Sequence, residues 1–282
     1  MDGTLSMTST QNDKFLSEYT TQDAISKYSR ATAGAGISYL LNHDYQQIYL
    51  DALELLPARV RQEGVRMLEF GCGAGMNLLH LISVLQTKAI NVETAIGTDF
   101  SPVMIGTAKR ETRHFLGEAA AQKIQFHIAK NETLLADLSA ATGTEPSTLK
   151  DSFHFVFAVN TIRYCHAANT EMDCARDVFD LLVPGGVCVV IDMNKGFPLF
   201  RTEVKNRFRR KKREECYIPS LEEYVAPFVK TGFELIRRET FCWIPHSAGP
   251  GLRDLMKGLS PLLNTVAKSH AMRCLVVARK PQ

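Results

Sequence analysis

The sequence has no apolar run long enough to form a membrane-spanning helix. Its longest apolar stretches, such as residues 187–191 and 274–278, are far shorter than the roughly 20 residues that such a helix requires. Residues 1–10 also lack the basic and apolar regions of a secretory signal. We therefore expect a cytoplasmic protein that has no membrane partner.

The chain also lacks paired cysteines and a strong excess of either charge. Its 7 cysteines are an odd number and include no CxxC pair, which fits neither a disulfide framework nor a zinc ribbon. Cys165, His166 and Cys174 form one irregular cluster without a second pair, so we expect no metal site. The formal net charge of +3 is too small, over the whole chain, to favour a nucleic-acid partner.

Internal repeats and low-complexity segments are missing as well, which argues against a solenoid or an array. The 282 residues, 45% of them hydrophobic, are enough to bury a full core. We expect one decorated domain over residues 61–282, preceded by a disordered N-terminus at 1–20 and a helical lid at 21–60. The sequence leaves open whether the tyrosine-rich lid exchanges between subunits of a homo-oligomer.

Short apolar or β-branched runs alternate with segments of helical character. In chain order the runs are 66–70, 94–99, 123–128, 153–159, 186–192, 233–243 and 272–279. Such alternation predicts an α/β protein with a mostly parallel seven-stranded sheet and helices on both faces. Proline and glycine interrupt the chain between the last two runs, so we expect an antiparallel strand at the edge.

Three regions fall outside this alternation, and we expect them to cap a pocket. In the first, residues 23–56, the spacing of apolar residues keeps one helical face apolar. The others, residues 194–220 and 246–269, are rich in charge, glycine or proline and follow the fifth and sixth predicted strands. We expect substrate specificity to depend on these segments.

The most informative motif is the segment 67–78, MLEFGCGAGMNL, in which a buried strand runs into three glycines at alternate positions and then into a helix. Glycine suits such a loop because it adopts positive φ and lets a ligand approach the backbone closely. A dinucleotide fingerprint would have its third glycine at position 76, where this chain has methionine. The methionine therefore disfavours NAD or FAD as the ligand. A GKS or GKT motif is also missing, which excludes the phosphate-binding loop of ATPases.

A carboxylate ends the second predicted strand. Asp99 is followed by Phe100 and then by a helix for which Ser101 is the N-cap and Pro102 the first residue. In α/β folds a carboxylate at this position holds the sugar of a nucleoside ligand. We therefore expect Asp99 to accept ribose hydroxyls and Phe100 to cover one face of the purine.

These motifs resemble those of the class I S-adenosylmethionine-dependent methyltransferases. The first motif of that family is similar to residues 68–75, and its proline and double-glycine turn before strand five is similar to residues 183–187. The end of its fourth strand is similar to residues 157–162. The similarity covers residues 67–192, just under half of the chain.

The resemblance implies a Rossmann-like fold, S-adenosylmethionine as cofactor and a set of cofactor-binding residues. Glu69 would organise the glycine loop, Gly71 and Gly73 would face the methionine part, and Asn131 would lie by the adenine. The other candidates for this set are Cys72, Gly75, Asp99, Phe100, Asn160, Tyr28 and Arg30. A sulfonium is an activated methyl donor, so the enzyme mainly has to align it with a nucleophile, an effect worth about 7 kcal/mol or more.

Residues after the fourth predicted strand are candidates for catalysis and substrate binding. His166 could act as a general base, because its ordinary pKa suits proton removal near neutral pH, or it could be a surface loop histidine. Tyr164 could orient a substrate or pack against the next helix. Arg163 and, from the N-terminal region, Tyr19 are candidates for substrate contacts.

A basic segment at 200–213 leaves the acceptor open. It contains eight basic residues against one acidic residue, and Arg201, Lys205 and Arg209 share one helical face. It could be a solvated surface, a clamp for an anionic substrate such as an isoprenoid diphosphate methylated on carbon, or a nucleic-acid footprint. We expect a methyltransferase acting on a small molecule in secondary metabolism. The alternatives are a C-methyltransferase of an isoprenoid diphosphate and a protein that modifies or binds nucleic acid.

Overall fold

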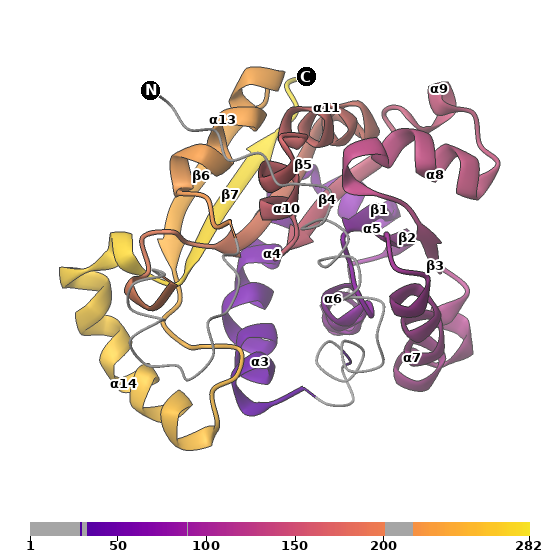
Figure 1. Cartoon of the computed structure of the whole chain (residues 1–282). Helices are drawn as coiled ribbons and strands as arrows, with labels where there is room; N and C mark the ends of the chain where they lie inside the picture. The colour runs from indigo at the N-terminus through magenta and orange to yellow at the C-terminus, as the bar shows by residue number, and fades with distance from the viewer. Residues whose placement is uncertain (1–28, 30–32, 89, 201–216) are drawn as a thin grey trace.

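The computed structural model describes residue 29 and residues 33–88, 90–200 and 217–282 (Figure 1). Within them the chain forms one seven-stranded sheet of order β3-β2-β1-β4-β5-β7-β6. The strands are β1 Val65–Phe70, β2 Val92–Asp99, β3 Ile124–Ile128, β4 Phe153–Val159, β5 Leu182–Met193, β6 Glu234–Phe241 and β7 Arg273–Arg279. The sequence therefore predicted each of these seven strands, with shifted ends; β5, for example, begins at Leu182 rather than Gly186.

The strand directions confirm the predicted α/β architecture. Strands β1 to β5 pair in parallel, whereas β7 runs antiparallel to both β5 and β6. The carboxyl ends of β1, β2, β4 and β5 therefore share one edge of the sheet. Because β7 is antiparallel, its first residues lie at this same edge, where α/β sheets bind ligands.

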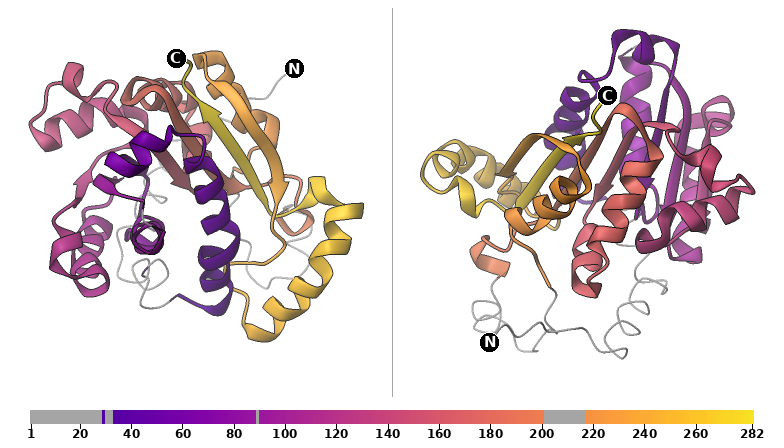
Figure 2. Two further views of the ribbon diagram at one scale, coloured as in Figure 1. Left: turned by 180° about the vertical axis from the view of Figure 1, so that it is seen from behind. Right: turned by 90° about the horizontal axis from the view of Figure 1, so that it is seen from above.

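Helices cover both faces of the sheet (Figure 2). They are α3 Ala35–Leu40, the π-helical η2 Leu41–Tyr45, α4 Gln46–Leu53, α5 Ala58–Glu63, α6 Met76–Thr87, α7 Pro102–Ala121, α8 Leu134–Thr142, α9 Pro146–Leu149, α10 Ile162–Ala168, α11 Glu171–Leu181, α13 Leu221–Thr231 and α14 Pro250–Val266. Single 3-10 turns are η3 Asn131–Thr133, η4 Pro198–Phe200 and η5 Lys268–His270.

The central strands β1 and β4 are buried on both sides, so their successive side chains belong to two different cores. Met67 packs on the face covered by α4, α6 and α7, whereas Leu68 packs on the face covered by α8, α11 and α13. This explains why the central strands read as continuous apolar runs rather than as an alternating pattern.

The described part of the lid, which we call the lid helices, is the continuous run α3, η2 and α4. It packs on a face of the sheet, because the Tyr49 ring lies 5.1 Å from that of Phe157. The lid also contacts the loop after β6, where the Gly36 amide donates to the Ala248 carbonyl at 2.9 Å. A Cβ at position 36 would lie 2.3 Å from the Pro245 carbonyl oxygen, so only glycine allows this approach.

Residues 246–269 contain a long helix, although their glycines and prolines suggested an interrupted segment. Pro250 occupies the first turn of α14, where its missing N–H costs nothing. Met256 and Leu263 pack on a small cluster around Trp243, whereas Leu255 on the outer side is 59% exposed. Across the described ranges, no helix combines the length and the apolar character needed to cross a membrane.

The contact between the lid helices and the sheet should contribute strongly to stability. Phe157→Ala leaves a cavity between β4 and α4, and we expect it to lower the free energy of unfolding by about 3–5 kcal/mol. Leu255→Ala on the exposed side of α14 is the control and should change it by less than about 0.5 kcal/mol. Urea denaturation measures both, and equal effects would contradict this packing.

Candidate active site

The glycine loop after β1 is held by backbone and side-chain hydrogen bonds. The Cys72 amide donates to the Thr98 carbonyl at 2.8 Å, and the Gly75 amide donates to the Cys72 carbonyl at 2.9 Å. Gly71, Gly73 and Gly75 all have positive φ, at 62°, 55° and 78°. Positive φ at every second residue of the loop explains why glycine alternates in the motif.

The three glycines have different surroundings. A Cβ at Gly71 would lie 2.1 Å from the Thr161 hydroxyl, and a Cβ at Gly75 would lie 3.0 Å from the Phe126 ring. A Cβ at Gly73 would meet nothing within 4 Å. Gly73 therefore faces open space, whereas Gly75, which we expected to contact the cofactor, is required for packing.

Asp99 connects the end of β2 to the glycine loop. Its carboxylate accepts from the Gly73 amide and from the Ser101 amide, each at 2.9 Å. Burial raises the pKa of Asp99, while these two backbone donors oppose that change. Ser101 caps α7 as expected, since its hydroxyl accepts from the Met104 amide at 3.3 Å.

Glu69 lies beneath the loop and does not line a cavity. Its carboxylate accepts from the Leu78 amide at 3.0 Å and from the Asn77 side-chain amide at 3.3 Å. These bonds hold the first turn of α6 in place. Burial raises the pKa of Glu69 to about 8.

A cavity of about 1080 Å³ opens at the carboxyl edge of the sheet. Among its lining residues are seven predicted cofactor-site residues, namely Gly71, Cys72, Gly73, Asp99, Phe100, Asn131 and Asn160. The lid helices contribute Ile37 and Tyr45, and the loop after β6 contributes residues 245–249. The lid helices and the loop after β6 therefore line the same cavity as the glycine loop.

The structure does not bring His166 into this cavity. His166 is on α10, where its ring lies 5.4 Å from that of Tyr224 on α13. Tyr164 and Ala168, one turn apart on α10, line the cavity instead, and position 166 falls on the opposite side of the helix. Burial lowers the pKa of His166. The expectation that His166 is a base at the site therefore has no geometric support.

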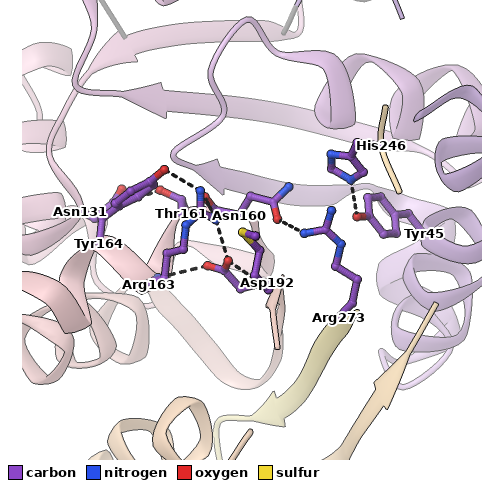
Figure 3. Close-up of polar contacts among 10 residues, drawn as sticks. Tyr45, Asn131, Asn160, Thr161, Arg163, Tyr164, Asp192, His246 and Arg273 are labelled. Carbon is purple, nitrogen blue, oxygen red and sulfur yellow. Dashed lines mark hydrogen bonds and ion pairs between the residues drawn. The ribbon is translucent and has the colours of Figure 1, made fainter. Parts of the chain in front are cut away.

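Arg163 lines the cavity but has partners in the protein. Its Nη1 atom donates to the Asp192 carboxylate at 2.7 Å and to the Asn160 carbonyl at 2.7 Å (Figure 3). Its backbone amide also donates to Asp192, and its Nη2 donates to the Tyr164 hydroxyl at 2.5 Å. Arg163 and Tyr164 therefore form part of a fixed wall of the cavity, and their predicted roles in contacting and orienting a substrate stay predictions.

Tyr45, His246 and Arg273 line the cavity although none of them was among the sequence candidates. The Tyr45 hydroxyl lies 3.0 Å from Nε2 of His246, and Arg273 donates to Asn160 Oδ1 at 2.5 Å (Figure 3). Burial, with help from the arginines Arg273 and Arg163, lowers the pKa of His246 well below its usual range. Tyr45 and His246 are far apart in the sequence, and no local pattern connects them.

Several predicted site residues lie outside the described ranges. They are Tyr19, Tyr28, Arg30, Arg201, Lys205 and Arg209. Their roles remain predictions.

A family model described as a methyltransferase domain matches residues 41–238. By sequence the chain matches none of the curated proteins.

Solved structures with a similar fold include three methyltransferases. Phosphoethanolamine N-methyltransferase 2 of Haemonchus contortus, in complex with S-adenosyl-L-methionine, has a TM-score of 0.58 at 18% identity, over 98% of this chain and 61% of that chain. An S-adenosylmethionine-dependent methyltransferase of Mesorhizobium loti has a TM-score of 0.53 at 18% identity, over 85% and 99%. The CMeT domain of the citrinin polyketide synthase has a TM-score of 0.53 at 14% identity, over 88% and 56%. At sequence identities this low, the structural similarity shows a shared fold and nothing more.

Burial of Glu69 should make stability depend on pH. The pKa of Glu69 is raised from 4.5 to about 8. Between these two pH values the folded protein therefore holds a proton that the unfolded chain has lost. The free energy of unfolding should therefore fall as pH rises from about 4.5 to about 8.

Glu69→Gln should reduce that fall by at least about 1 kcal/mol. The exposed Glu54→Gln serves as the control and should keep the slope of the wild type. Denaturant titrations at several pH values measure the slopes. Identical slopes for wild type and Glu69→Gln would show that this carboxyl group is not protonated in the folded protein.

Proposed function

We propose that this chain, a member of the methyltransferase domain family, transfers a methyl group from S-adenosylmethionine to a small-molecule acceptor. The family match at 41–238 covers more than half of the 282 residues, which shows that the chain belongs to this family. The cofactor is S-adenosylmethionine. The proposal adds the class of acceptor and the residues that bind each ligand. The single observation that carries it is the cavity that Gly73 and Asp99 share with the residues under the lid helices.

The residues around the glycine loop fit the cofactor. The missing Cβ at Gly73 leaves free space beside a backbone that is already fixed by its bond to Asp99. Asn77 also lines the cavity, and its Oδ1 is buried without a hydrogen-bond partner among the described residues. An ammonium group such as that of the methionine part would satisfy this acceptor.

We assign the nucleoside to the β2 side of the cavity. The Asp99 carboxylate has lone pairs beyond those used by Gly73 and Ser101, so it can accept ribose hydroxyls. Phe100 and Met104 supply apolar surface for the adenine, and Asn131 supplies polar groups at its edge. The Asn131 side-chain amide already donates to the Thr161 hydroxyl at 2.8 Å, which fixes its orientation.

The other side of the cavity is assigned to the acceptor. S-adenosylmethionine supplies an activated methyl group, so the contribution of the protein is mainly to align the acceptor and exclude water. The lid helices and residues 245–249 close this side and are held together by the Gly36–Ala248 hydrogen bond. His246 lines this side of the cavity with its Nε2 3.0 Å from the Tyr45 hydroxyl, and we assign to this pair the contact with the acceptor.

The volume of the cavity supports a small acceptor. Pockets for one small ligand are roughly 300–1,000 Å³, and this cavity of about 1080 Å³ slightly exceeds that range. It can hold a nucleoside cofactor and one further small molecule. The similar folds of phosphoethanolamine N-methyltransferase 2 and of a polyketide synthase CMeT domain support the same class of acceptor. The two alternatives, an isoprenoid diphosphate and a nucleic acid, rest on the segment 200–213, most of which lies outside the described residues.

A methyl group at position 73 should block the cofactor. We expect Gly73→Ala to weaken S-adenosylhomocysteine binding at least tenfold, because the new Cβ occupies the space beside the loop. Gly143→Ala is a matched control, since Gly143 also has positive φ and open space but ends α8 away from the cavity.

Each substitution should cost about 1–2 kcal/mol of stability through left-handed backbone strain. Isothermal titration calorimetry then separates binding from strain, because only Gly73→Ala should lose affinity. Equal affinities for the two variants, or no binding by the wild type, would contradict the proposed site.

A further inference from the structure

Arg273 occupies an unusual position for a cation. It begins β7, and because β7 is antiparallel to β5, its side chain reaches the carboxyl edge of the sheet where the cavity lies. It is only 4% exposed and lines the cavity together with Asn160, Tyr45 and His246. Figure 3 shows its guanidinium group between Asn160 and the Tyr45–His246 pair.

The guanidinium group of Arg273 has few partners. Its Nη1 atom donates to Asn160 Oδ1, a neutral acceptor. Its Nε atom is buried and has no hydrogen-bond partner within the ranges that the structure describes. Because a guanidinium group carries five N–H donors, most of its donors lack an acceptor in that part of the chain. The edge formed by Nε and Nη2 is the one with which arginine binds carboxylates and phosphates through two parallel hydrogen bonds.

The surrounding side chains do not neutralise this charge. The Asp192 carboxylate accepts from the Arg163 side chain and backbone and from the Met193 amide, so it is committed to Arg163. His246 is held neutral by burial and by the two arginines, and burial raises the pKa of the Tyr45 hydroxyl. Two guanidinium groups, those of Arg163 and Arg273, therefore line this end of the cavity, and the buried Asp192 carboxylate pairs with Arg163.

We propose that Arg273 binds an anionic group, a carboxylate or phosphate, of the methyl acceptor. A buried charge without a counter-ion is costly, and an anionic ligand would remove that cost. The proposal rests on the proposed function and specifies its acceptor as an anion. It places the recognition of that anion on β7 rather than on the basic segment at 200–213.

The carboxylate on the methionine part of the cofactor is a second anionic group of the kind that an arginine binds. Strands β4 and β5 separate β7 from β1, whose end carries the glycine loop. With about 4.8 Å between neighbouring strands, the ends of β1 and β7 are roughly 14 Å apart. This separation favours the acceptor as the ligand of Arg273.

Binding of simple anions tests the proposal. Inorganic phosphate and acetate are titrated calorimetrically, at constant ionic strength, into the protein saturated with S-adenosylhomocysteine. We expect Arg273→Gln to raise the Kd of these anions at least tenfold and to change the Kd of S-adenosylhomocysteine less than twofold. Arg279→Gln, at the other end of β7 in an ion pair with Glu234, is the matched control and should bind anions as the wild type does.

Three results would overturn the proposal. The first is a wild type that binds neither anion, and the second is an Arg273→Gln protein that binds them equally well. The third is a loss of S-adenosylhomocysteine affinity in Arg273→Gln of tenfold or more, which would assign Arg273 to the carboxylate of the cofactor. Failure of the wild type to bind S-adenosylhomocysteine would instead count against the proposed function, and the anion titration can be run without it.

A lysine variant covers the case in which Arg273→Gln does not fold. Arg273→Lys keeps the positive charge and loses the planar pair of donors. Anion binding weakened at least threefold, with unchanged S-adenosylhomocysteine affinity, supports the proposal. Unchanged anion affinity overturns it. Circular dichroism establishes beforehand which variants are folded.

Discussion

The hydrogen bond between the Gly73 amide and the Asp99 carboxylate joins the parts on which the site depends. It connects the loop after β1 to the end of β2, and the second oxygen of Asp99 connects both to the start of α7 through Ser101. Glu69 performs a similar role from below by holding the first turn of α6. A loop with three positive-φ glycines would otherwise sample many conformations, so the side chains of Asp99 and Glu69 give it one shape before a ligand arrives.

The cavity has two chemically different halves. The half near β1 and β2 offers backbone, carboxylate and apolar surface, which suits a nucleoside. The half near β5 and β7 offers the buried arginines Arg163 and Arg273 and the Tyr45–His246 pair. Asn160 lies between them and has positive φ, so its backbone turns at the point where β4 ends. This division is the basis for assigning one half to the cofactor and the other to the acceptor.

The sequence alone predicted the sheet and pointed to many of the residues that line the β1 and β2 side of the cavity. Both depend on local patterns: apolar runs for strands, alternate glycines for the loop, and an acidic residue at a strand end. The sequence suggested His166 for the site because it follows the fourth strand, but this segment forms α10, and His166 lies on the side of that helix away from the cavity. Tyr45, His246 and Arg273 were not predicted as site residues. Their roles arise from contacts across the whole chain, such as the pair Tyr45–His246, which no local spacing encodes.

The most direct test of this account is a crystal structure of the protein with S-adenosylhomocysteine. The account predicts electron density for the ribose at Asp99, for the homocysteine part beside Gly73, and for the sulfur facing the half of the cavity that contains His246 and Arg273. Density for the ligand outside this cavity, or with its sulfur turned toward β3, would contradict it.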